Sequence, residues 1–223
     1  MSNLVWFRFA GHDQMQISKR FIFFLFALLS GSGIRAQNLD VRLLRPIFDD
    51  RTNFKDHFFK ADAQSVEFIN ILAPVGIFAA GYIHHDGRLE RDAAFIAGAY
   101  AVSALLTQSA KAIIKRARPF ETYPQFFTDR YDGGGYSFPS GHGSAAFCTA
   151  TSLSLYFRRW YVIFPSYLWA SSVAWARMYQ GVHYPTDLLA GAVLGAGSAW
   201  AGWLIQRSYE KRRANRQIAI SLY

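Results

Sequence analysis

Basic residues and histidines gather in three short segments of this sequence, each beside an apolar run. The first is KAIIKRARP, residues 111–119, the second is PSGH, residues 139–142, and the third is RMYQGVHYPTD, residues 177–187. Cations and helix N-termini attract anions, and an imidazole next to a carboxylate can serve as a nucleophile. The three segments together therefore indicate one site for a phosphate group.

In the first segment, Lys111 and Arg118 are seven residues apart. On a continued helix they would project from similar faces two turns apart, so that both could reach one anion, and Pro119 would then favour the end of that helix. Basic residues at a helix end also act as interfacial anchors, which is the simpler interpretation of this segment taken alone. Lys115 and Arg116 are expected to have only that anchoring role.

The second segment stands directly before an apolar run, at the expected start of a helix. Unpaired backbone N–H groups and the helix dipole attract an anion there. Ser140 can cap the helix and donate its hydroxyl, while Gly141 leaves the backbone open to close approach. Taken alone, the segment also fits an ordinary helix cap followed by an exposed histidine, His142.

In the third segment, His183 and Asp187 are four residues apart, and Pro185 between them suits the first turn of a helix. A carboxylate that accepts a hydrogen bond from one imidazole nitrogen leaves the other nitrogen free as a nucleophile. Asp187 also fits a helix N-terminus, where the dipole favours a carboxylate. Arg177 ends an otherwise uncharged run, where a guanidinium needs water or an anionic partner.

In order and spacing, the segments resemble the motifs of the type 2 phosphatidic acid phosphatase (PAP2) superfamily, which includes lipid phosphatases, bacterial acid phosphatases and vanadium haloperoxidases. The matching pattern is Lys-x6-Arg-Pro, then Pro-Ser-Gly-His, then Arg-x5-His-x3-Asp. The resemblance implies that His183 attacks phosphorus, that Asp187 orients His183, and that His142 protonates the leaving oxygen. It further implies a set of residues that hold the phosphoryl group: Lys111, Arg118, Ser140, Gly141 and Arg177.

One position departs from the family pattern, because Ala176 stands where a serine or threonine usually precedes the arginine. We expect no metal and no other cofactor, since cations and backbone dipoles can stabilise the charge on the equatorial phosphoryl oxygens. The histidines of His84-His85-Asp86 lack a convincing fourth ligand, which argues against a metal site in that segment.

The elements that must position these residues are apolar. Five uncharged stretches are interpreted as helices, at residues 68–83, 93–110, 143–157, 160–176 and 188–205. Two of them reach the length of about 18 residues that marks a membrane span, and flanking polar residues can extend the shorter ones toward the interface. The sequence therefore predicts an all-α, membrane-embedded bundle of about five core helices.

The chain begins with a segment that has the layout of a secretory signal: two basic residues, an uncharged run at residues 21–34, and small residues up to Ala36. We expect residues 1–36 to be a signal peptide or an uncleaved N-terminal anchor, with Met15 as a possible alternative start. Residues 37–223 would then form one PAP2-like phosphatase domain.

Residues 38–67 carry mixed charges without catalytic spacing and predict an amphipathic surface helix. Basic residues in the linkers predict the orientation, because cytoplasmic loops are enriched in lysine and arginine. These residues are Arg88, Arg91, Arg158, Arg159 and the cluster at residues 207–216. All three motif segments then lie at the outer face, which predicts a multi-pass protein of the cytoplasmic (inner) membrane with its active site toward the periplasm.

The composition fits this expectation. A chain of 223 residues, 52% apolar and 17% aromatic, suits one domain with a large core or a membrane bundle. Lysine and arginine exceed aspartate and glutamate by 24 to 15, but they lie mostly between apolar runs rather than on one polar face, which argues against a nucleic-acid partner. Cys148 is the single cysteine, so no intrachain disulfide can form.

The combined prediction is a metal-independent phosphatase that hydrolyses a lipid phosphate or lipid diphosphate at the periplasmic face through a phosphohistidine intermediate. A soluble periplasmic acid phosphatase of the same superfamily is the first alternative, favoured by the leader and by a mean hydropathy of +0.06. A non-catalytic protein that binds or transports a lipid phosphate is the second, and the presence of both His142 and His183 argues against it.

Overall fold

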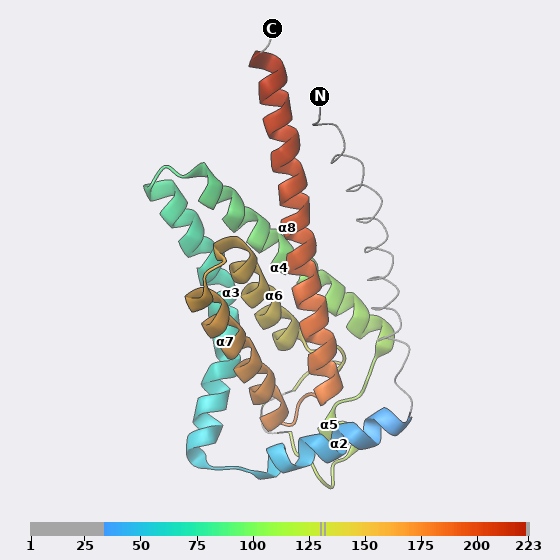
Figure 1. Ribbon diagram of the computed structural model, residues 1–223. Helices are drawn as coiled ribbons and strands as arrows, with labels where there is room; N and C mark the ends of the chain where they lie inside the picture. Colours follow the sequence, from blue (N-terminus) through green and yellow to red (C-terminus); the bar gives the residue numbers. More distant parts are fainter. Residues whose placement is uncertain (1–33, 130, 132, 222–223) are drawn as a thin grey trace, which may run out of the picture. The chain divides into compact units, whose positions relative to one another are not determined.

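The computed structural model describes residues 34–129, 131 and 133–221 of the chain, so most of the predicted leader lies outside the described residues. Within this described part, every regular element is a helix, which confirms the all-α prediction (Figure 1). The helices are α2 (Ile34–Asp49), α3 (Asn53–Ile83), α4 (Gly87–Ile114), α5 (Pro119–Thr122), α6 (Gly141–Phe157), α7 (Trp160–Tyr179) and α8 (Pro185–Ser221).

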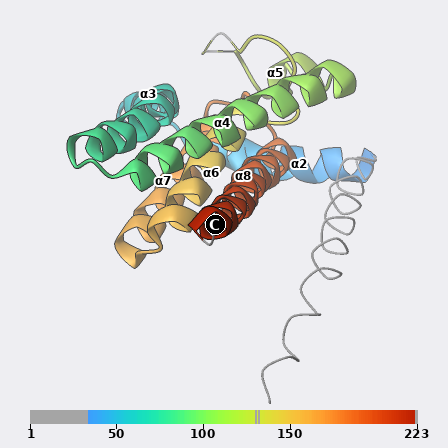
Figure 2. The same cartoon turned by 90° about the horizontal axis from the view of Figure 1, so that it is seen from above.

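The compact unit from Asp40 to Tyr223 is a helical bundle with α6 at its centre. Helix α6 packs against α3, α4, α7 and α8, and the two ribbon views show it enclosed by these helices (Figures 1 and 2). Each of the five predicted stretches falls within one of these five helices. From the preceding unit, residues 1–39, the structure describes only the first residues of α2.

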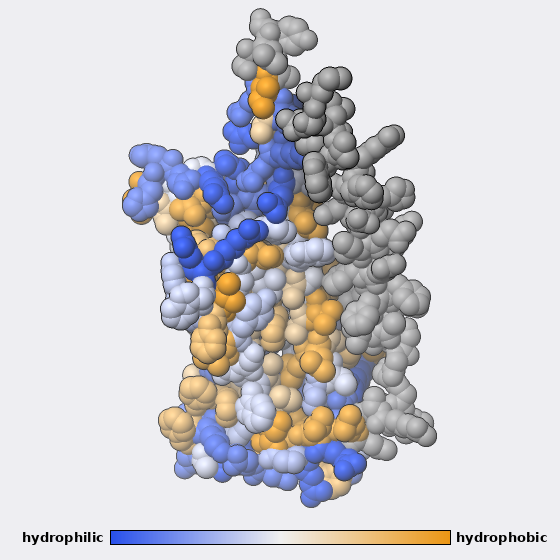
Figure 3. Space-filling model, in the orientation of Figure 1, coloured by the Kyte–Doolittle hydropathy of each residue, from blue (hydrophilic) through white to orange (hydrophobic). Residues whose placement is uncertain are grey.

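Three segments are long and apolar enough to cross a membrane: Asn53–Ile83, Gly87–Thr122 and Pro185–Ile218. Helix α6 is shorter, with 17 residues, and α7 is rich in tryptophan and tyrosine, which have low hydropathy. Figure 3 shows hydrophobic residues along the middle of the visible face and hydrophilic residues at both ends. This distribution is that of a membrane protein.

Small residues let α8 approach α6 closely. A Cβ atom at Gly195 would collide with the Ser144 carbonyl oxygen, and one at Gly191 would lie 2.6 Å from the Ser140 oxygen. The close approach places the first turns of the two helices together, where the Ser140 amide donates to the Asp187 carbonyl at 3.0 Å. The second and third motif segments are thereby joined through the backbone.

The structure corrects two expectations about where helices begin and end. Helix α4 ends at Ile114, because Lys115 adopts a left-handed conformation (φ 51°) and Arg118 has the extended conformation of the residue before a proline. The predicted continuous helix from Lys111 through Arg118 is therefore wrong.

The predicted surface helix at residues 38–67 is divided between α2 and the first half of α3. Its N-terminal part does not lie only on the surface. Leu44 and Phe48 of α2 are buried against Phe127 and against Tyr184 of the third motif segment. This packing brings α2 to the end of the bundle that carries the motif residues.

Candidate active site

Residues of all three motif segments meet at one end of the bundle. Lys111 lies in the last turn of α4, His142 in the first turn of α6 and Arg177 in the last turn of α7. His183 lies in the short loop between α7 and α8, and Asp187 in the first turn of α8. Two hydrogen bonds join the segments there, because Arg118 Nη1 donates to the carbonyl of Val182, next to His183, and the Ser140 amide donates to the Asp187 carbonyl.

His183 and Asp187 form a buried pair in which the side chains are 2% and 0% exposed. Nδ1 of His183 lies 3.6 Å from Asp187 Oδ2, slightly too far for a hydrogen bond, and has no hydrogen-bond partner in the described part of the chain. The two side chains are thus close, and the orienting hydrogen bond stays a prediction. Burial lowers the pKa of His183 below its usual value, and the charge of Arg177 lowers it further, while Asp187 opposes both effects.

The Asp187 carboxylate is held from several sides. Oδ2 accepts a hydrogen bond from the buried Ser137 hydroxyl and another from the Tyr184 amide at 2.9 Å. Oδ1 accepts from Arg116 Nη1 at 2.6 Å. With these three donors the carboxylate cannot rotate freely, so the oxygen that faces His183 is fixed in place.

Arg116 joins Asp187 to a second buried carboxylate that the sequence reasoning missed. Its Nη2 donates to Asp40 Oδ2 at 2.7 Å, and its guanidinium lies 4.0 Å from the centroid of the Tyr184 ring. Asp40 also accepts from the Thr186 amide at 3.1 Å and from the Thr186 hydroxyl at 2.6 Å.

The expectation that Arg116 is only an anchor is therefore wrong. Helix α4 ends one turn earlier than expected, at Ile114, and the side chain of Arg116, which follows the left-handed Lys115, reaches both carboxylates. No spacing in the sequence connects Asp40 with the motif segments, so no pattern could have indicated it.

Arg177 carries a buried donor that no acceptor meets. Nη1 donates to Gln180 Oε1 at 2.6 Å, and Gln180 is itself held by the Phe59 carbonyl at 3.2 Å. Nε of Arg177 is buried and has no hydrogen-bond partner among the described residues. Because buried donors are almost always satisfied in folded proteins, this N–H marks a position for an acceptor such as a phosphoryl oxygen.

Ser140 and Gly141 begin α6 as predicted. The buried Ser140 side chain accepts from the Gly143 amide at 3.2 Å, which makes it the N-cap of the helix. A Cβ atom at Gly141 would meet nothing closer than the Thr107 methyl group at 4.0 Å, so the backbone is accessible there. This open helix start is suited to an anion.

Lys111 and Arg118 contact the loop that precedes the second motif segment. Lys111 Nζ donates to the Tyr136 carbonyl. The Arg118 guanidinium donates to the carbonyls of Gly135 at 2.9 Å, Gly134 at 2.6 Å and Val182 at 2.9 Å. The buried Arg118 side chain thereby joins the loop at Gly134 and Gly135 to Val182, the residue before His183. The motif did not suggest that Arg118 binds backbone carbonyls. Groups of three or more potential metal ligands are not found in the described residues.

The fold and this site define an all-helical membrane protein with a cation-lined pair of histidines at one end of its helices. The family model of the PAP2 superfamily matches residues 92–211. The chain belongs to the PAP2 superfamily, as the motif resemblance predicts.

Two curated relatives illustrate the similarity. The chain is 42% identical over 81 residues to a lipid A 4'-phosphatase of Bacteroides thetaiotaomicron, covering 36% of this chain and 36% of that protein. It is 30% identical over 105 residues to an undecaprenyl-diphosphatase of Sulfolobus acidocaldarius, covering 47% and 49%. The matched regions thus span half or less of these relatives.

Two solved structures share the fold. The crystal structure of a transmembrane PAP2 type phosphatidylglycerolphosphate phosphatase from Bacillus subtilis aligns with a TM-score of 0.72 at 21% identity, covering 85% of this chain and 95% of that one. The structure of Aquifex aeolicus LpxE aligns with a TM-score of 0.62 at 24% identity, covering 74% and 94%. At these identities the match defines the fold, a membrane-embedded helical bundle.

Proposed function

We propose that this protein is a phosphatase that removes a phosphate group from a lipid phosphate or lipid diphosphate. The observation that carries the proposal is the meeting of His183, Asp187 and the unsatisfied Nε of Arg177 at the end of apolar helices. A lipid whose tail stays in the bilayer can present its headgroup there. The relatives named for lipid A and for undecaprenyl diphosphate support a lipid substrate.

In the first step, Nε2 of His183 attacks phosphorus and the bond from phosphorus to the leaving oxygen breaks. The lowered pKa of His183 keeps its imidazole neutral near pH 7, which a nucleophile requires. Nδ1 then carries the proton and faces Asp187, and its hydrogen bond is expected to tighten in the occupied site. His142, in its protonated imidazolium form, gives its proton to the leaving oxygen and becomes neutral.

In the second step, water attacks the phosphohistidine. The P–N bond breaks, His142 takes the proton from water, and inorganic phosphate leaves with both histidines restored. Lys111, Arg118 and Arg177 together with the N-terminal amides of α6 stabilise the charge on the equatorial oxygens in both steps. The reaction so written balances without a metal ion.

Arg116 and Asp40 have a positioning role in this mechanism. Their side chains bond to each other, to Thr186 and to Asp187, and they thereby fix the carboxylate that orients the nucleophile. Asp40 lies outside the residues that the family model matches, so α2 completes the catalytic end of this chain.

The proposed location is the cytoplasmic (inner) membrane, with the active site toward the periplasm. Support comes from the charge distribution, because the basic residues of the linkers lie at the opposite ends of the same helices. Residues 1–36 would be the leader or anchor and residues 37–223 the phosphatase domain. A soluble periplasmic acid phosphatase is less well supported, since three segments have the length and hydropathy of membrane spans. Carbonate extraction distinguishes the two, because an integral protein stays in the pellet.

The test of the function is phosphate release by the purified full-length chain. The substrates are diacylglycerol phosphate, phosphatidylglycerophosphate, undecaprenyl diphosphate and lipid A in mixed micelles, with glycerol phosphate as the soluble comparison. We expect a higher kcat/KM for at least one lipid than for glycerol phosphate. The variant His183→Ala should release no phosphate from any of these substrates. Hydrolysis of the soluble ester alone would favour the acid phosphatase, and tight lipid binding without any phosphate release would favour a binding or transport protein.

A further inference from the structure

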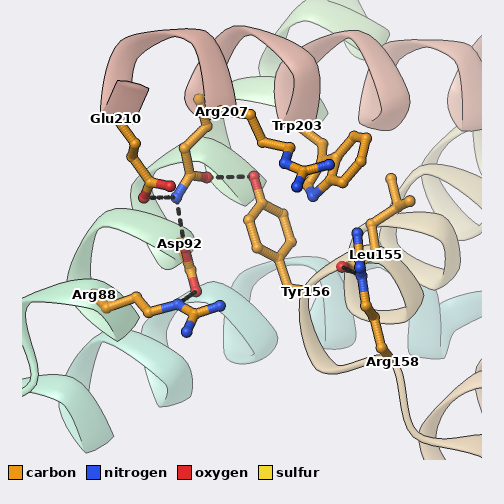
Figure 4. A pocket seen from close by; sticks show the side chains of 9 residues that line it. Arg88, Asp92, Leu155, Tyr156, Arg158, Trp203, Arg207 and Glu210 are labelled. Atoms are coloured by element: carbon orange, nitrogen blue, oxygen red, sulfur yellow. Dashed lines mark hydrogen bonds and ion pairs between the residues drawn. The ribbon is translucent and has the colours of Figure 1, made fainter. Parts of the chain in front are cut away.

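A polar cavity lies at the opposite end of the bundle from the candidate active site. It has a volume of about 230 Å³ and is formed by the start of α4, the end of α6 and the middle of α8 (Figure 4). Its lining includes Arg88, Arg158, Trp203 and Arg207. On α8, Trp203 follows Asp187 by 16 residues, which corresponds to about 24 Å along the helix. The two sites are thus separated by most of the thickness of a membrane.

Two arginines of the cavity are held by one aromatic ring. The guanidinium carbons of Arg158 and Arg207 lie 5.3 Å and 4.6 Å from the centroid of Trp203. Stacking of this kind orients a guanidinium while leaving its edge N–H groups available. Neither arginine forms an ion pair within the part of the chain that the structure describes; Arg158 Nε donates only to the Leu155 carbonyl at 3.2 Å.

Arg158 occupies a backbone position that usually belongs to glycine. It is the C-cap residue of α6 and has a left-handed conformation with φ of 46°. A non-glycine residue at such a position costs about 1 kcal/mol. The conformation directs the chain from α6 into α7 at the point where the Arg158 side chain reaches Trp203.

The carboxylates of the cavity are already occupied. Asp92 accepts from Gln206 Nε2 at 2.5 Å and lies 3.9 Å from Arg88. Glu210 accepts from the same Gln206 nitrogen at 3.0 Å, and Tyr156 donates to Gln206 Oε1 at 2.6 Å. Figure 4 shows this network on one side of the cavity and the two stacked arginines on the other, so the positive side is free of opposing carboxylates.

We propose that this cavity binds the phosphodiester headgroup of an anionic phospholipid in the leaflet opposite to the active site. Arginine edges match phosphate oxygens in a bidentate manner, and basic pockets between membrane helices suit anionic headgroups. Tryptophan at this depth is typical of the membrane interface.

The proposal is independent of the phosphatase reaction, and phosphatidylglycerol tests it because this lipid has no terminal phosphate to hydrolyse. The full-length protein in neutral detergent is titrated with phosphatidylglycerol and, separately, with phosphatidylcholine, and bound lipid is counted by native mass spectrometry. The wild type should bind phosphatidylglycerol more tightly. The double variant Arg158→Gln/Arg207→Gln should lose about tenfold in affinity, which corresponds to about one charge-assisted hydrogen bond.

The matched control is Arg159→Gln/Arg212→Gln, which removes the same charge from two exposed residues that do not line the cavity. It should change the affinity less than about twofold, as distant surface charges contribute little. Equal losses in the two double variants would overturn the proposal in favour of a general surface charge. Equal binding of phosphatidylcholine, or displacement of phosphatidylglycerol by inorganic phosphate, would also overturn it.

Folding is checked by the melting temperature and by hydrolysis of p-nitrophenyl phosphate, neither of which should change in the double variant. If that variant does not fold, Arg207→Gln alone serves, because Arg207 is exposed in the middle of α8. Its affinity for phosphatidylglycerol should fall by a factor of about three to five, and unchanged affinity would contradict the proposal.

Discussion

Arg116 donates a hydrogen bond of 2.6 Å to Asp187, and through its other terminal nitrogen it is bonded to Asp40. Both carboxylates are buried, so the single guanidinium between them balances charges that would otherwise repel each other across a few ångströms. Asp40, which precedes the family motifs in the sequence, is in this way linked through Arg116 to Asp187. The Asp187 carboxylate in turn faces His183, the proposed nucleophile.

Arg116→Gln should lower both stability and turnover. Removing one partner of a buried ion pair costs about 3–5 kcal/mol, because the remaining charge stays buried without compensation. We expect a lower melting temperature and a slower formation of the phosphoenzyme at saturating substrate, with partial recovery in Arg116→Lys. Lys115→Gln, at the exposed neighbouring position, is the control and should resemble the wild type. Wild-type rates in Arg116→Gln would disprove the positioning role.

The two motif histidines should respond differently to alanine. His183→Ala is expected to abolish both turnover and the phosphoenzyme, because no other side chain near phosphorus replaces the nucleophile. His142→Ala should lose a factor of about 10² to 10⁴ on an alkyl phosphate, whose leaving oxygen needs a proton, and less on p-nitrophenyl phosphate. Radiolabelled phosphate on the quenched protein measures the intermediate. Equal proportional losses of His142→Ala on both substrates would remove the support for a general acid.

Chelation should leave the activity intact, and vanadate should inhibit it. The proposed site stabilises phosphoryl charge with Lys111, Arg118 and Arg177, and five-coordinate vanadate imitates the transition state of phosphoryl transfer. Phosphate release is measured with and without EDTA after dialysis. A loss of activity that a divalent ion restores would contradict a mechanism without metal.

Labelling of single cysteines in a Cys148→Ala background should report the orientation. A cysteine at Gly134, exposed in the loop beside the active site, should react with a membrane-impermeant maleimide added to intact cells. A cysteine at Arg212, exposed near the end of α8, should react only after the membrane is opened. The reverse pattern would place the active site on the cytoplasmic side.

Gly195→Ala should destabilise the bundle. Its Cβ atom would overlap the Ser144 carbonyl oxygen and approach the Cys148 amide to 2.9 Å, and both are backbone atoms that cannot move aside easily. Overpacking of this kind costs about 1–3 kcal/mol. Gly76→Ala in α3 is the matched control, since nothing lies within 4 Å of the added methyl group, and it should be neutral or slightly stabilising. Equal melting temperatures of the two variants would show that α6 and α8 separate readily.

The sequence by itself determined the helices and the motif residues. Uncharged stretches of 15 or more residues bounded by charges can satisfy their backbone only as helices in a membrane, so the apolar pattern indicated all five core helices. The spacing of Lys111, His142 and His183 identified the family. Catalytic residues of this fold lie at helix ends that meet, so the lengths of the helices between them set the spacing of the motifs.

Only the tertiary structure decided which polar groups meet. The left-handed Lys115 breaks the helix that spacing had predicted to continue, and this turn brings Arg116 to Asp187 and Arg118 to the backbone of two loops. Asp40 joins them across 76 residues of sequence, a distance over which no helical or strand period operates. Periodicity reports the environment along one element, whereas hydrogen bonds between elements depend on where the chain turns and how the helices pack, and those relations are absent from any local pattern.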